Sequence, residues 1–138
     1  MNFITLHLVA LIITAPVVLY ADHMGFKYLT GRTPTISAKK LAWTHHLVTI
    51  GLILLIVSGI IITVPLWAIM FEKPLFYAKL AFVCTLATNG FFIGKLMKKA
   101  SVIPFADLSV EEKRLLFVSG MVSACSWGTT ILIGFFGL

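Results

Sequence analysis

The sequence predicts an all-α integral membrane protein, a four-helix bundle that forms a single domain over residues 1–138. Hydrophobic residues make up 59% of the chain and charged residues 12%, and the mean hydropathy is +1.03. A soluble domain is about half apolar and about a quarter charged, so this composition excludes a soluble globular protein. Four apolar stretches are each long enough for the roughly 20 helical residues that cross a bilayer, and too long for the roughly ten of a barrel strand.

The expected spans run approximately over Phe3–Tyr20, Leu41–Trp67, Leu75–Gly94 and Leu115–Leu138. We expect the first span to remain in the mature chain. No Lys or Arg precedes it, and no small-residue cleavage pattern follows it before Asp22.

Residues with known preferences for helix ends mark the borders of these spans. Ser109, with Glu112 three residues later, forms a capping-box pattern that predicts the start of the last helix. Ser37 is a candidate N-cap of the second helix, and Pro74 suits the first turn of the third. Pro16 lies inside the first span and is expected to kink it.

Small and weakly polar residues recur at helical spacing and indicate which helix faces meet. The second helix carries Thr44, Gly51 and Ser58, and the third carries Ala78, Ala81, Thr85 and Thr88. The fourth carries Ser119, Ser123, Ser126 and Thr130, beside Gly120, Ala124 and Gly128. We interpret these three stripes as surfaces on which the helices pack closely.

Nine of the eleven basic residues fall on one side of this arrangement. They are Lys27, Arg32, Lys39, Lys40, Lys95, Lys98, Lys99, Lys113 and Arg114, whereas Lys73 and Lys79 lie near the other side. Because Lys and Arg are enriched in cytoplasmic loops, both basic loops are expected in the cytoplasm and the N and C termini on the outer side. The same rule explains the net charge of +6 without a nucleic-acid partner, and leaves the lipid bilayer as the expected partner.

Two ionisable residues are expected inside the membrane near the outer side. His7 lies one to two turns into the first helix, and Lys79 lies about one turn into the third. Ionisable groups are costly in hydrocarbon, so each is a candidate site. The histidine can be an axial ligand of heme iron, and the lysine can pair with a heme propionate or another anion. In the alternative interpretation, Lys79 reaches the membrane surface and His7 hydrogen-bonds a neighbouring side chain.

A second ionisable group is expected on the cytoplasmic side, where Asp22 and His23 end the first span and His45 and His46 begin the second. Imidazole and carboxylate together suit a divalent metal ion such as zinc, iron, copper or nickel. Adjacent helical residues point about 100° apart, so the expected ligands are Asp22, His23 and one of the paired histidines. Which of His45 and His46 faces the bundle stays open. The alternative is that all four are polar residues at headgroup depth.

Two segments carry a family resemblance. LHLVALIITAPVVLY is similar to the opening helix of the HemJ-type protoporphyrinogen IX oxidases, and YAKLAFVCTLATNGFFIGKLMKKA resembles their lysine-bearing helix. The resemblance implies a bacterial inner (cytoplasmic) membrane protein that binds heme b, with His7 as the heme ligand and Lys79 as the lysine of the family's Lys-Leu pair. SGMVSACSWGTT stands where that family has an Asn-Glu-x-Pro stretch. The chain also resembles small bacterial four-helix membrane proteins without an assigned activity.

Three functions from different classes therefore compete. The first is a heme b protein with a redox role similar to that of the HemJ-type oxidases. The second is a metal-binding or transport-related bundle built on the inner histidines. The third is a non-catalytic membrane subunit or assembly factor, acting as a homo-oligomer or within a larger complex. The sequence match favours the first.

The charge asymmetry makes a testable prediction about topology. Cysteine-accessibility tags at residue 31 and near residue 105 are expected to react only with reagents applied from the cytoplasm, because both positions lie in basic loops. Labelling of either loop from the outside would contradict the predicted orientation.

Overall fold

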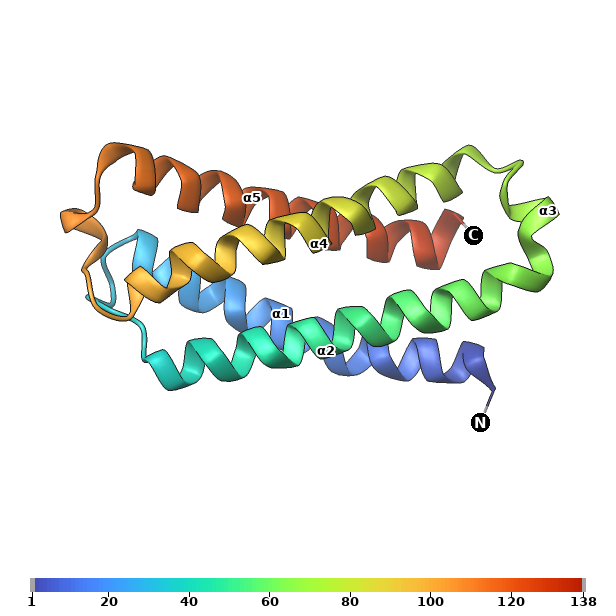
Figure 1. Ribbon diagram of the computed structural model, residues 1–138, viewed down its shortest axis with the longest axis horizontal. Coiled ribbons are helices and arrows are strands. Elements are labelled where there is room, and N and C mark those ends of the chain that lie inside the picture. The colour runs from blue at the N-terminus through green and yellow to red at the C-terminus, as the bar shows by residue number, and fades with distance from the viewer. Residues whose placement is uncertain (1, 138) are drawn as a thin grey trace.

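The computed structural model describes residues 2–137, and the regular secondary structure in this range is helical throughout (Figure 1). Four long helices are present in this range: α1 (Phe3–Leu29), α2 (Ala38–Thr63), α4 (Pro74–Ala100) and α5 (Val110–Leu132). Each belongs to a helical segment that is long and apolar enough to cross a membrane. The predicted all-α fold with four membrane-spanning helices is therefore confirmed.

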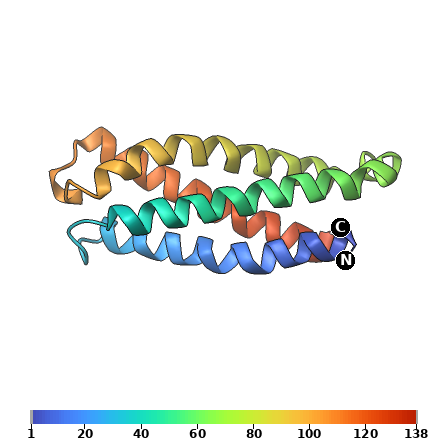
Figure 2. The ribbon, with the colours of Figure 1, turned by 60° about the horizontal axis from the view of Figure 1, so that its bottom comes forward.

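Short elements connect the long helices. The 3-10 turn η1 (Val64–Leu66) and the one-turn helix α3 (Trp67–Met70) join α2 to α4, and η2 (Phe105–Asp107) lies between α4 and α5. A π-helical turn, η3 (Ile133–Gly137), follows α5. Both ends of the chain lie at the same end of the bundle as α3, here called the terminal end (Figures 1 and 2). The α1–α2 and α4–α5 connections lie at the opposite, loop end.

Helices α1 and α4 continue past the apolar runs that predicted them, whereas α2 ends at Thr63, before the expected end at Trp67. Helix α1 continues nine residues past the expected end at Tyr20, so Asp22 and His23 lie within it rather than at its end. Met24 and Tyr28 are buried in this extension, and their packing explains why the helix continues after the hydropathy falls. Leu138, the expected end of the last span, lies outside the described residues.

Two of the three predicted helix starts are confirmed in detail. The Ser109 side chain accepts a hydrogen bond from the Glu112 backbone N–H, and the Glu112 carboxylate accepts one from the Ser109 N–H. Pro74 occupies the first turn of α4. Ser37 stands at the N-cap of α2, but its side chain makes no capping hydrogen bond.

Helix α1 packs mainly against α2, and α4 packs mainly against α5, so the bundle consists of two helical hairpins. Thr44, Gly51 and Ser58 are the buried residues of α2, as the small-residue stripe predicts. A Cβ atom added at Gly51 would overlap the side chain of Thr14 on α1. Glycine at this position therefore allows the two backbones to approach closely.

The α4–α5 hairpin is joined by a pair of hydrogen bonds. The Asn89 amide donates to the Ser119 carbonyl oxygen at 3.0 Å, and the Ser119 hydroxyl donates to Asn89 Oδ1 at 2.7 Å. The predicted stripe on α4 is wrong, because Thr85 and Thr88 are exposed. Each donates its hydroxyl to the carbonyl four residues earlier on its own helix, so neither needs a partner helix. On α5, Ser119 and Ser126 are buried as the stripe predicts.

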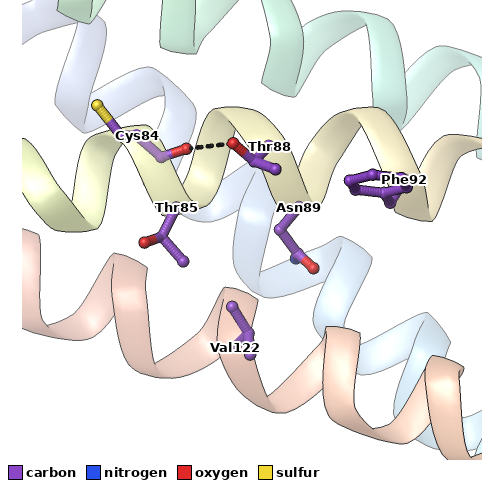
Figure 3. Close-up of a pocket in the computed structure, with 6 residues that line it drawn as sticks. All are labelled: Cys84, Thr85, Thr88, Asn89, Phe92 and Val122. Atoms are coloured by element: carbon purple, nitrogen blue, oxygen red, sulfur yellow. Dashed lines mark hydrogen bonds between the residues drawn. The ribbon is translucent and has the colours of Figure 1, made fainter.

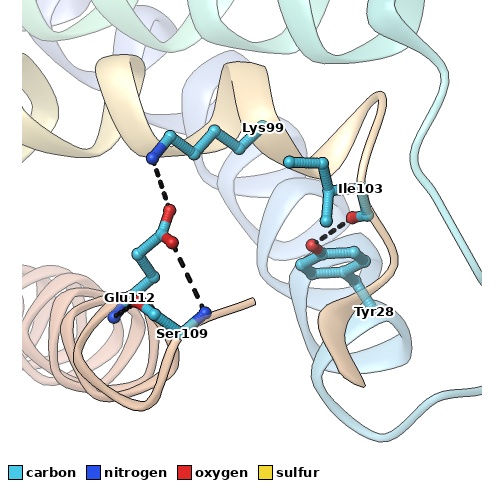
Figure 4. Close-up of polar contacts among 5 residues, drawn as sticks. All are labelled: Tyr28, Lys99, Ile103, Ser109 and Glu112. Atoms are coloured by element: carbon cyan, nitrogen blue, oxygen red, sulfur yellow. Dashed lines mark hydrogen bonds and ion pairs between the residues drawn. The ribbon is translucent and has the colours of Figure 1, made fainter. Parts of the chain in front are cut away.

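At the loop end, a buried apolar cluster connects the two hairpins. It comprises Met24, Tyr28, Ile36, Ala100, Leu108 and Leu116. The Tyr28 hydroxyl donates to the Ile103 carbonyl oxygen at 2.7 Å (Figure 4), and the Ile36 N–H donates to the Ala100 carbonyl oxygen at 2.9 Å. In Figure 4 the Glu112 carboxylate links Lys99 to the cap at Ser109. The loop end is thus held by both packing and hydrogen bonds.

The close contact at Gly51 makes a testable prediction. Gly51→Val is expected to destabilise the protein by about 1–3 kcal/mol, because the new side chain would meet the stiff, β-branched Thr14. The measurement is the unfolding free energy in mixed micelles. Gly90→Val on α4 is the control, since a Cβ there meets nothing within 4 Å. Equal changes in the unfolding free energy of the two variants would show that no close contact is involved at Gly51.

Candidate functional site

His7 is held by a hydrogen bond between the helices of the first hairpin. Its Nδ1 lies 2.8 Å from the Ser58 hydroxyl oxygen, and that hydroxyl lies 2.6 Å from the Leu54 carbonyl oxygen. A serine hydroxyl has one hydrogen, and a carbonyl oxygen can only accept. Since Ser58 donates to Leu54, His7 Nδ1–H donates to Ser58. The lone pair of the imidazole then resides on Nε2.

The His7 ring packs against α2 at a glycine. A Cβ atom on Gly59 would be 3.5 Å from His7 Cε1. His7 itself is half-buried. The Cε1 edge of the imidazole therefore faces a backbone surface without a side chain.

Lys79 lies half-buried near the same, terminal end of the bundle. Its Nζ is 3.5 Å from the position that a Cβ would take on Gly134, within the π-helical turn η3. Within residues 2–137 the one salt bridge is Lys99–Glu112, at the other end. The Lys79 ammonium thus lies in a spanning helix without an acidic partner in the described part of the chain.

A further polar atom points to this region. The hydroxyl oxygen of Thr130 is buried and has no hydrogen-bond partner in the structure. Thr130 in α5 precedes Gly134 in η3 by four residues, which is about one helical turn. Buried hydroxyls are nearly always paired with protein, water or a ligand. The terminal end therefore combines an imidazole with a free nitrogen, an unpaired ammonium and an unpaired hydroxyl.

The four residues predicted as metal ligands are spread over different faces. Asp22 lines a pocket between α1 and α5, whereas His23 is exposed on α1. His45 lies against α4, where its Cε1 would be 3.2 Å from a Cβ on Gly94. Of the paired histidines, His45 therefore contacts another helix. The ring centres of His45 and His46 lie 6.3 Å apart. Across residues 2–137, no group of three or more His, Cys, Asp or Glu residues could hold a metal ion.

A groove on the second hairpin, lined by both polar and apolar side chains, was not anticipated from the sequence. It has a volume of 390 Å³ and is lined by Cys84, Thr85, Thr88, Asn89, Phe92 and Val122 (Figure 3). The sequence signal for a polar contact here is Asn89, which stands in the middle of an apolar run. An amide inside a membrane helix needs a hydrogen-bond partner on a neighbouring helix. Ser119 fills that role.

Comparison with known proteins returned nothing. No protein-family model matches the chain, and no curated protein or solved structure matches it either.

Proposed function

We propose that this is a heme b protein of the bacterial inner membrane, with His7 Nε2 as an axial iron ligand and a redox role similar to that of the HemJ-type oxidases. The observation that carries the proposal is the hydrogen bond between His7 Nδ1 and Ser58. Histidines that bind metals almost always donate their other ring N–H to a second residue, which fixes the tautomer and the ring orientation. The His7–Ser58–Leu54 chain supplies such a donor–acceptor arrangement.

The charge at the terminal end supports an anionic ligand. Heme b carries two propionates, and an ammonium inside the membrane is costly unless an anion accompanies it. Lys79 would hold such a carboxylate, and the unpaired Thr130 hydroxyl could donate to one. Neither the groove at Asn89 nor the pocket at Asp22 is lined by His7 or Lys79, so these two residues would hold the group at the surface of the bundle. Heme, when bound, would supply one-electron redox chemistry.

The distribution of the basic residues supports an orientation of this site in the membrane. With the basic loop end in the cytoplasm, the terminal end and His7 face the outer side. A ligand held there would be accessible from the outer leaflet. The inner histidines are not part of this proposal, since they lie near the loop end.

The first test is the absorption spectrum of the purified protein. Wild type expressed with ample heme is expected to show a b-type Soret band, and His7→Ala to lose it. Lys79→Ala is expected to retain heme more weakly, because the iron ligand remains while a charge partner is lost. His46→Ala is the matched control, an exposed histidine near the loop end, and should keep the full spectrum. A colourless wild-type protein would overturn the proposal and favour a non-catalytic membrane subunit.

The second test concerns Ser58 as a positioning residue. Ser58→Ala removes the acceptor of the His7 N–H and is expected to weaken heme affinity about 10- to 100-fold and to shift the reduction potential. Thr44→Val is the control, because Thr44 is an equally buried hydroxyl of the same stripe that bonds only to its own helix. An unchanged affinity and potential in Ser58→Ala would contradict the positioning role.

A further inference from the structure

A second cavity lies between α1 and α5, far from His7. It has a volume of 190 Å³, about that of six molecules of liquid water. Its walls include Val18 and Leu19 of α1 and Ala124, Trp127 and Gly128 of α5. Asp22 is the one ionisable side chain among its lining residues. The cavity is therefore an apolar space with a single acidic group.

Small residues on α5 create this space. Ala124 and Gly128 are one turn apart, and a Cβ added at Gly128 would meet nothing within 4 Å. One residue from each helix anchors the pocket, because Val18 of α1 and Trp127 of α5 are buried together with Leu86 in a core cluster that joins the two hairpins. Leu19, Ala124 and Gly128 are exposed, so the pocket opens to the surface of the bundle.

Among residues 2–137, the Asp22 carboxylate has no hydrogen-bond or ion-pair partner that would compensate for its position within a spanning helix. It lies seven residues before the end of α1, about 10 Å along the helix axis. Within residues 2–137 its carboxylate takes part in neither the hydrogen bonds nor the salt bridge of the structure. A carboxylate at this depth is costly unless a cation accompanies it.

We infer that this pocket binds a compact organic ammonium ion, with the charged group on Asp22 and the apolar body against Trp127. A single carboxylate balances one positive charge, and the large apolar side chain of Trp127 offers contact area to the apolar body of the ligand. Apolar walls offer no further oxygen ligands, so the site does not suit a bare metal ion. The volume suits a small amine or the amine of a lipid headgroup.

The test uses Trp127 as the reporter. Trp43 and Trp67 are each 63% exposed, so Trp43→Phe and Trp67→Phe leave one tryptophan, in the wall of the pocket. Cyclohexylammonium is titrated into the purified full-length protein, with cyclohexanol as its neutral analogue of similar shape. We expect the ammonium ion to change the Trp127 fluorescence at concentrations about tenfold lower than the alcohol requires.

Three variants separate charge from shape. Asp22→Asn should bring the affinity for cyclohexylammonium down to that for cyclohexanol, and Gly128→Val should abolish both responses by filling the cavity. Gly120→Val is the control, a glycine of α5 outside the pocket with equal space around it. Equal binding of amine and alcohol to wild type, or unchanged amine binding to Asp22→Asn, would overturn the inference and leave a cavity for apolar chains. The Asp22→Asn result decides the question even if the glycine variant misfolds.

The source of the amine is distinguished by competition. Short-chain phosphatidylethanolamine is added to the cyclohexylammonium complex in detergent, with short-chain phosphatidylglycerol as the lipid without an amine. Displacement by the first lipid alone identifies a headgroup ligand. Retention of cyclohexylammonium with both lipids identifies a free amine.

Discussion

The contact between α1 and α2 at Gly51 determines where the polar groups of the first hairpin lie. His7 precedes Thr14 by seven residues, and Ser58 follows Gly51 by seven, so in antiparallel helices both pairs belong to one seam two turns apart. A shift of register at Gly51 would also carry His7 away from Ser58. The imidazole would then lack a hydrogen-bond partner in hydrocarbon. The His7–Ser58 hydrogen bond and the close approach at Gly51 therefore favour the same alignment of α1 and α2.

The sequence could predict features that depend on one helix at a time. Apolar length indicated the four spans, the Ser109–Glu112 spacing indicated a cap, and the period of Thr44, Gly51 and Ser58 indicated the buried face of α2. The predicted stripe on α4 failed because threonine hydroxyls satisfy themselves on their own helix, so their spacing carries no information about a neighbour. Which of two adjacent histidines contacts α4 depends on the rotation of α2, which only packing between helices determines.

Helix α1 contributes ionisable groups to two chemically different places. His7 faces α2, whereas Asp22 faces α5, about 22 Å further along the same helix. Among residues 2–137, Lys79 at the terminal end has no acidic partner and Asp22 in the α1–α5 pocket has no basic partner, so the ligands proposed for the two places carry opposite charges. His7 and His23 are 16 residues apart, about 24 Å along one helix, so their spacing in the sequence excludes a shared ligand. That spacing could not show that Asp22 turns away from the histidines, because the pocket arises from the small side chains of α5.

The division into two hairpins has a consequence for biogenesis. Because α1 finds most of its contacts on α2, the first pair can become a stable unit in the bilayer while α4 and α5 are still being synthesised. In the orientation that the basic loops predict, the N terminus and the short η1–α3 connection are the parts of this first pair that cross the membrane. The second pair would follow as its own insertion unit, and the loop-end cluster around Tyr28 can form only after Ala100 and Leu108 have emerged from the ribosome. Closure of the loop end therefore comes after the first pair has formed.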